Sequence, residues 1–96
     1  MTDSDAAITI ERLEGDVFAV CVAGAGRETR HHVLLAPVVL ARLAPGHAPE
    51  RLVEAAFRFL LDREPAQAIL ARFDLPVIAR YFPEFERELP RYLARG

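Results

Sequence analysis

The sequence predicts an α+β fold, a three-stranded antiparallel meander followed by about four short helices that pack on one face of the sheet. Three observations support this fold class. The first 35 residues contain three strand-like segments joined by short turns, all seven prolines follow them, and the segments between the later prolines are apolar at helical spacing. With 96 residues and no linker, the chain is expected to be a single domain, 1–96, whose polar residues 1–7 are disordered.

The three strand segments distribute their apolar residues differently. Ile8–Glu14 alternates between apolar and polar residues, which is typical of a strand with one buried face. Val17–Ala23 is apolar at every position, so we expect it to be the central strand, covered on both faces. Glu28–Leu35 alternates again, with Arg30 and His32 on its polar face.

Proline delimits the helices, because it starts a helix far more readily than it continues one. Val38–Leu43 follows Pro37 and predicts a short helix. Pro49–Arg63 has the widest apolar arc and is expected to be the main support of the core. Three further helices are predicted at Pro65–Phe73, at Leu75–Phe82 with Asp74 as N-cap, and at Pro83–Leu93, which Pro90 should kink or end.

Charge and composition restrict the classes of function. The net charge of −2 argues against a strongly basic protein that binds nucleic acid or a membrane surface. All 12 basic residues are arginine and alanine occurs 16 times, which is typical of a GC-rich bacterial genome, so the arginines are not read as a phosphate-binding signal. The apolar runs are far shorter than the ~20 residues of a membrane span. A single cysteine and the lack of a signal peptide predict a cytoplasmic location.

No pattern of residues predicts catalysis, a metal or a cofactor. Cys21 lies in the all-apolar segment and is expected to be a buried, inert filler. The neighbouring His31 and His32 point to opposite faces of a strand, so they cannot easily chelate one metal, and both are expected to be solvated. Capping explains the carboxylates near predicted helix ends, those of Asp62, Glu64 and Asp74. We therefore expect a protein that is not an enzyme.

Aromatic residues concentrate late in the chain. Seven of the eight lie between residues 57 and 92. Stacking on nucleic-acid bases would be one use for them. Residues 49–96 carry eight acids and eight arginines, however, and this neutral balance favours a packed helical core.

Four short segments together form one further pattern. They are Phe59-Leu-Leu-Asp-Arg-Glu-Pro65, Ile69-Leu70, Phe73-Asp-Leu-Pro-Val-Ile78 and Tyr81-Phe-Pro-Glu-Phe85. They resemble a family of short bacterial proteins of unknown function. The resemblance implies a complete bacterial chain, and it brings no catalytic residues with it.

A polar strand, a short helix, a glycine turn and a longer helix follow one another at Thr29–Leu35, Val38–Leu43, Gly46 and Pro49–Arg63. This order resembles that of ribbon–helix–helix repressors and antitoxins. The resemblance implies DNA recognition through polar strand side chains, here Arg30 and His32, with Arg27 beside them.

The leading hypothesis is a small non-catalytic interaction or regulatory module. If the helices cover one face of the sheet, Val17, Ala19 and Cys21 remain as an apolar patch on the other, suited to a second copy in a homodimer or to another protein. Were the late helices to cover that face, the next interface candidates would be Tyr81, Phe85 and Tyr92. The alternative is a DNA-binding or antitoxin-like repressor, which the acidic charge balance does not favour.

Overall fold

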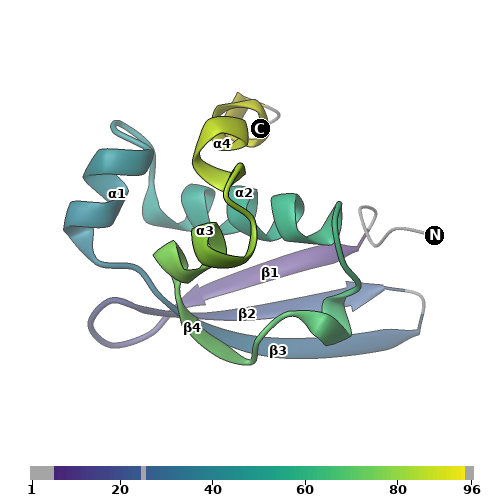
Figure 1. Ribbon diagram of the computed structural model, residues 1–96. Coiled ribbons are helices and arrows are strands. Elements are labelled where there is room, and N and C mark those ends of the chain that lie inside the picture. Colours follow the sequence, from purple (N-terminus) through teal and green to yellow (C-terminus); the bar gives the residue numbers. More distant parts are fainter. Residues whose placement is uncertain (1–5, 25, 95–96) are drawn as a thin grey trace.

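The computed structural model describes residues 6–24 and 26–94, and its fold is α+β (Figure 1). One four-stranded sheet has the order β1-β2-β3-β4. Its strands are β1 (Ala7–Arg12), β2 (Val17–Gly24), β3 (Arg27–Leu34) and β4 (Arg72–Asp74). The first three strands are antiparallel neighbours, which confirms the predicted meander, and β2 lies between two strands as expected. The expectation that β2 is covered on both faces is wrong, because only alternate residues of the strand are buried.

The fourth strand corrects the prediction of a three-stranded sheet. β4 pairs in parallel with β3, and the His32 amide donates to the carbonyl of Ala71 at 2.7 Å. The predicted helix Pro65–Phe73 is instead a short 3-10 helix, η1 (Ala66–Ala68), followed by this strand. A strand of three residues with one buried side chain is too short to produce an alternating pattern, so nothing local distinguishes it from a loop or a helix.

The helices α1–α4 lie on the same side of the sheet, as Figure 1 shows, in agreement with the predicted one-sided packing. Their bounds are α1 (Pro37–Leu43), α2 (Pro49–Leu61), the 3-10 helix η2 (Leu75–Val77), α3 (Ile78–Tyr81) and α4 (Phe85–Ala94). Proline occupies the first position of α1 and of α2, where its missing N–H breaks no hydrogen bond.

Helix α2 forms the centre of the core, as its wide apolar arc predicts. Eight of its 13 residues are buried. Phe57 packs against the rings of His31 and Phe73 on the sheet side. Phe59 points toward the later helices, where its ring contacts those of Phe85 and Tyr92 edge-on. Most of the late aromatic residues therefore build a packed core, with α2 between two layers, while Tyr81 is exposed.

Pro90 does not end α4, which runs on to Ala94. Arg51 of α2 donates to the carbonyls of Tyr92 and Leu93 at 3.0 and 2.7 Å, so two carbonyls at the end of α4 have a partner despite the proline. Burial of Leu89 and Tyr92 on the same helix adds packing that offsets the lost hydrogen bond.

Ordered structure begins earlier in the chain than the sequence predicts. Of the seven residues expected to be disordered, residues 1–5 lie outside the described part of the chain. Ala6 is buried and its carbonyl accepts a hydrogen bond from Arg58 Nη1 at 2.7 Å, and Ala7 already belongs to β1. The partner that orders Ala6 is 52 residues away, so the local sequence does not reveal it.

Candidate functional site

The sheet has one face without helices. Alternate residues of β2 point to opposite faces, and Phe18, Val20 and Val22 are buried under the helices. We call the opposite surface the bare face. Its described members on the four strands are Ala7, Thr9, Glu11, Val17, Ala19, Cys21, Ala23, Glu28, Arg30, His32, Leu34, Arg72 and Asp74. The predicted interface residues Val17, Ala19 and Cys21 all lie on it, and no helix of the described chain covers them (Figure 1).

One row of residues on the bare face has opposite charges at its two ends. Strand pairing aligns Glu11, Ala19, His32 and Arg72 in one row that crosses all four strands. The carboxylate is on β1 and the guanidinium on β4, with small or neutral side chains between them. In the described part of the chain neither Glu11 nor Arg72 has an ion-pair partner.

Cys21 is only partly buried, which corrects the prediction of a buried thiol. Its strand is central, but the outer side of that strand has no covering element, so the thiol reaches the surface of the bare face. Hydrogen bonding to Glu28 and partial burial raise the pKa of the Cys21 thiol, which disfavours the thiolate that a nucleophile requires.

The residues proposed for nucleic-acid contact do not share one face. Arg30 and His32 lie on the bare face, whereas the register of β3 places Arg27 on the opposite side. The Arg30 guanidinium donates to Glu28 at 3.1 Å, which partly neutralises it. Among the residues that the structure describes, this surface therefore has mixed charge and no basic patch.

The three alternative interface residues separate in the structure. Phe85 and Tyr92 are buried beside Phe59 in the core, so of this group only Tyr81 is available at the surface. Both buried rings lie on the inner side of α4, where they connect it to α2. Tyr81 is 66% exposed on the single-turn helix α3.

His31 is buried, which corrects the expectation that both strand histidines are solvated. Its Nδ1 lies 2.8 Å from the carbonyl of Leu70 and its Nε2 lies 2.9 Å from Thr29 Oγ1. In the neutral ring Nδ1–H donates to Leu70 and Nε2 accepts from the hydroxyl. His32 points to the other face, and no group of three metal-binding side chains exists among the described residues.

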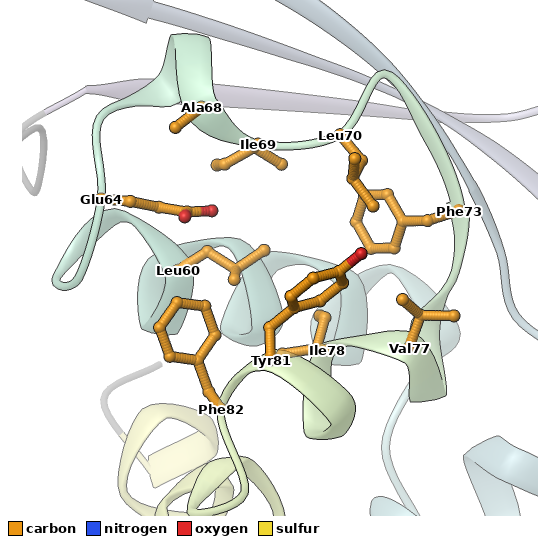
Figure 2. A pocket seen from close by; sticks show the side chains of 10 residues that line it. All are labelled: Leu60, Glu64, Ala68, Ile69, Leu70, Phe73, Val77, Ile78, Tyr81 and Phe82. Atoms are coloured by element: carbon orange, nitrogen blue, oxygen red, sulfur yellow. The ribbon is translucent and has the colours of Figure 1, made fainter.

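A second feature lies on the helix side of the sheet, a cavity of about 310 Å³ (Figure 2). Its walls come from the end of α2, from η1 and the segment after it, from β4, and from η2 and α3. The lining residues are Leu60, Glu64, Ala68, Ile69, Leu70, Phe73, Val77, Ile78, Tyr81 and Phe82. The cavity is therefore apolar, with one carboxylate and one hydroxyl in its walls.

Glu64 was missed by sequence reasoning, which attributed its carboxylate to helix capping. It follows the C-terminal end of α2, where capping by a carboxylate does not apply, and Figure 2 shows its side chain directed into the cavity. Desolvation by burial raises the pKa of the Glu64 carboxyl. An acidic residue just after a helix end is the signal in the sequence that could have marked it.

Neither Asp62 nor Asp74 is described with a side-chain capping hydrogen bond of the kind that was predicted. Asp62 accepts a hydrogen bond from the hydroxyl of Tyr92 at 2.5 Å, which joins α2 to α4. Asp74 occupies the N-cap position of η2, as predicted for the helix that begins there, but its side chain makes no capping hydrogen bond.

Fold and surface together define a class of protein: a small α+β domain whose mixed sheet is covered by helices on one face and bare on the other. No helix within residues 6–24 and 26–94 has the length and apolar character needed to cross a membrane. Comparison of the chain with protein-family models, curated proteins and solved structures gives no match.

Proposed function

We propose that the protein is a non-catalytic interaction module that acts through the bare face, and that the partner bound there is a second copy of the chain. The observation that carries this proposal is the one-sided packing of the helices, which leaves the small side chains of Val17, Ala19, Cys21 and Ala23 in the middle of an uncovered sheet. Leu34, beside them on β3, is 43% exposed. Covering such a surface removes apolar area from water.

The charges on the bare face complement those of a second copy. Consider two copies whose bare faces meet, related by a two-fold axis that runs parallel to the strands between the two sheets. This axis places β1 of one copy over β4 of the other, and residues of the same row stay at the same height along the strands. Glu11 of one protomer then faces the partner's Arg72, and the same contact occurs twice. This arrangement pairs both groups with opposite charges, which supports it.

The size of the face indicates a weak dimer. At about 3.3 Å per residue and about 4.8 Å between strands, the strands of six, eight, eight and three residues give about 400 Å² per copy and about 800 Å² for two. This total is below the standard size of stable interfaces, so we expect a weak dimer with a dissociation constant of about 1–100 µM.

A charge in the middle of the face should disrupt the dimer. Ala19→Glu buries an unpaired carboxylate beside Glu11, and we expect at least a tenfold weaker association by sedimentation over this concentration range. Ala41→Glu, an exposed position on α1, is the matched control and should leave association unchanged. A wild-type chain that stays monomeric at about 1 mM, or a dimer that tolerates Ala19→Glu, overturns the proposal.

Charge reversal tests the orientation of the two copies. Glu11→Arg and Arg72→Glu should each weaken the dimer, because each brings like charges together across the interface. The double variant restores opposite charges and should recover most of the wild-type affinity. Failure of the double variant to recover, with circular dichroism showing a folded protein, would contradict the strand-parallel two-fold axis.

Accessibility of Cys21 provides an independent measurement. Its thiol lies on the bare face, so alkylation should become slower as the protein concentration rises and the dimer forms. Equal rates for dilute and concentrated protein would place the interface elsewhere. If duplex DNA, added at low salt, bound the wild-type chain and lost affinity on Arg30→Ala, the repressor hypothesis would replace this one.

A further inference from the structure

We propose that the cavity between α2, η1 and α3 is a binding site for a small apolar molecule that carries a protonated amine. The site lies on the helix side of the sheet and is independent of the bare face (Figures 1 and 2). Its volume of about 310 Å³ is close to the lower limit of about 300 Å³ for small-molecule sites, which selects a ligand of one ring or a short alkyl chain.

The walls provide an apolar surface with two aromatic rings that pack on core phenylalanines. The Phe73 ring packs on Phe57 with centroids 6.1 Å apart, and the Phe82 ring packs on Phe59 at 5.9 Å. Ile78, at the base, is buried. A ligand entering between these side chains would meet a preformed surface, which reduces the entropy lost on binding.

The mouth of the cavity has exposed apolar side chains. Leu70 is 45% exposed and Tyr81 is 66% exposed, and both face the cavity in Figure 2. Large exposed hydrophobic residues gathered at the opening of an apolar cavity are typical of a surface that a ligand covers. The Tyr81 hydroxyl adds a group that can donate or accept a hydrogen bond.

The carboxylate of Glu64 determines the charge of the ligand. Within the described part of the chain its oxygens have no hydrogen-bond or ion-pair partner. The adjacent Arg63 does not pair with it, because Arg63 Nε donates to Glu84 Oε2 at 3.0 Å. The carbonyls at the C-terminal end of α2 add negative potential on the same side. A partly desolvated, unpaired carboxylate beside aromatic rings favours a cationic group, which it would bind by a charge-assisted hydrogen bond.

Three matched ligands test the charge preference. The probes are 2-phenylethylamine, which is protonated at pH 7, the neutral 2-phenylethanol and the anionic 3-phenylpropanoate, with binding followed by calorimetry and by amide chemical shifts of Leu70 and Tyr81. We expect the amine to bind at least about tenfold more tightly than the alcohol, and the anion to bind most weakly.

Two variants test the role of the carboxylate. Glu64→Gln preserves the size of the side chain and should remove the preference for the amine while the alcohol still binds. Glu14→Gln, at an exposed turn remote from the cavity, is the control and should behave as the wild type. Because burial raises the pKa of Glu64 above its ordinary value of 4.5, the preference for the amine should begin to weaken while the pH is still above 4.5 on acidification.

Three outcomes would overturn the assignment. These are no binding of the amine at about 10 mM, equal affinity of the wild type for amine and alcohol, and a preference that persists in Glu64→Gln. None of them bears on the dimer, because the variants and the probes act on the opposite side of the sheet.

Discussion

His31 is a single buried residue that connects three parts of the chain. Its ring bonds Thr29 on its own strand, bonds the carbonyl of Leu70 before β4, and packs on Phe57 of α2. Burial lowers the pKa of His31, and the hydrogen bond to Leu70 opposes this effect only in part. The neighbouring His32 has no such surroundings, because adjacent residues of a strand face opposite sides of the sheet.

The lowered pKa of His31 predicts a loss of stability on acidification. The unfolded chain binds the proton more tightly than the folded chain, so the contribution of His31 is complete above its ordinary pKa of 6.5 and is lost as the pH falls through the lowered pKa. The loss should approach about 1.4 kcal/mol per pH unit at most.

Comparison with a variant isolates this effect from the titration of carboxylates. His31→Gln retains a donor and an acceptor but does not titrate, so the difference in unfolding free energy between it and the wild type should change below pH 6.5. His47→Gln, in the exposed loop between α1 and α2, is the control. Parallel pH profiles for the wild type and His31→Gln would show that His31 titrates normally.

At the scale of elements, α4 illustrates how packing outweighs local preference. Its interior proline removes one hydrogen bond, yet the helix is held against α2 by Arg63, whose guanidinium lies 3.7 Å from the centroid of the Phe59 ring and bonds Glu84. Arg51 bonds the last carbonyls of the helix. The position of α4 therefore depends on arginines of α2 and the segment after it.

Replacing Pro90 by alanine should stabilise the protein. Proline is about 3 kcal/mol less favourable than alanine inside a helix, and the more flexible unfolded chain of the variant offsets about 1 kcal/mol of this. We expect Pro90→Ala to raise the free energy of unfolding by about 1–2 kcal/mol in chemical denaturation. Pro83→Ala, before α4, should give no such gain; equal effects at both positions would show that the interior site is not strained.

At the scale of the whole molecule, α2 connects the sheet to the outer helices. Phe57 is fully buried between His31 and Phe73, while Phe59 contacts the aromatic rings of α4. A sheet covered on one face has a single hydrophobic core. In this protein both the sheet and the outer helices contact α2. Stability should accordingly be most sensitive to truncation along α2.

Truncation of Phe57 to alanine should remove about 3–5 kcal/mol of stability, a large part of the total for a domain of this size. Both the lost apolar contacts and the resulting cavity contribute. Denaturant unfolding measures the change, with Val38→Ala, 73% exposed on α1, as a control expected within about 0.5 kcal/mol. A loss below about 1 kcal/mol for Phe57→Ala would contradict the central position of this side chain.

The sequence by itself determined the first three strands and the helices α1 and α2. These features follow from signals within a few residues: strand alternation, proline at the start of a helix and the apolar arc of α2. The conformational preference of each of these segments depends mainly on its own residues, so the local sequence is sufficient to predict these elements.

Only the tertiary structure decided the fourth strand, the burial of His31 and the cavity around Glu64. β4 exists because Phe73 pairs with Val33, 40 residues earlier, and His31 finds its acceptor on Leu70. The cavity assembles from several separate elements, and its carboxylate is desolvated only when they meet. Pairing, burial and desolvation over such separations depend on the folded arrangement, and no window of the sequence contains both partners.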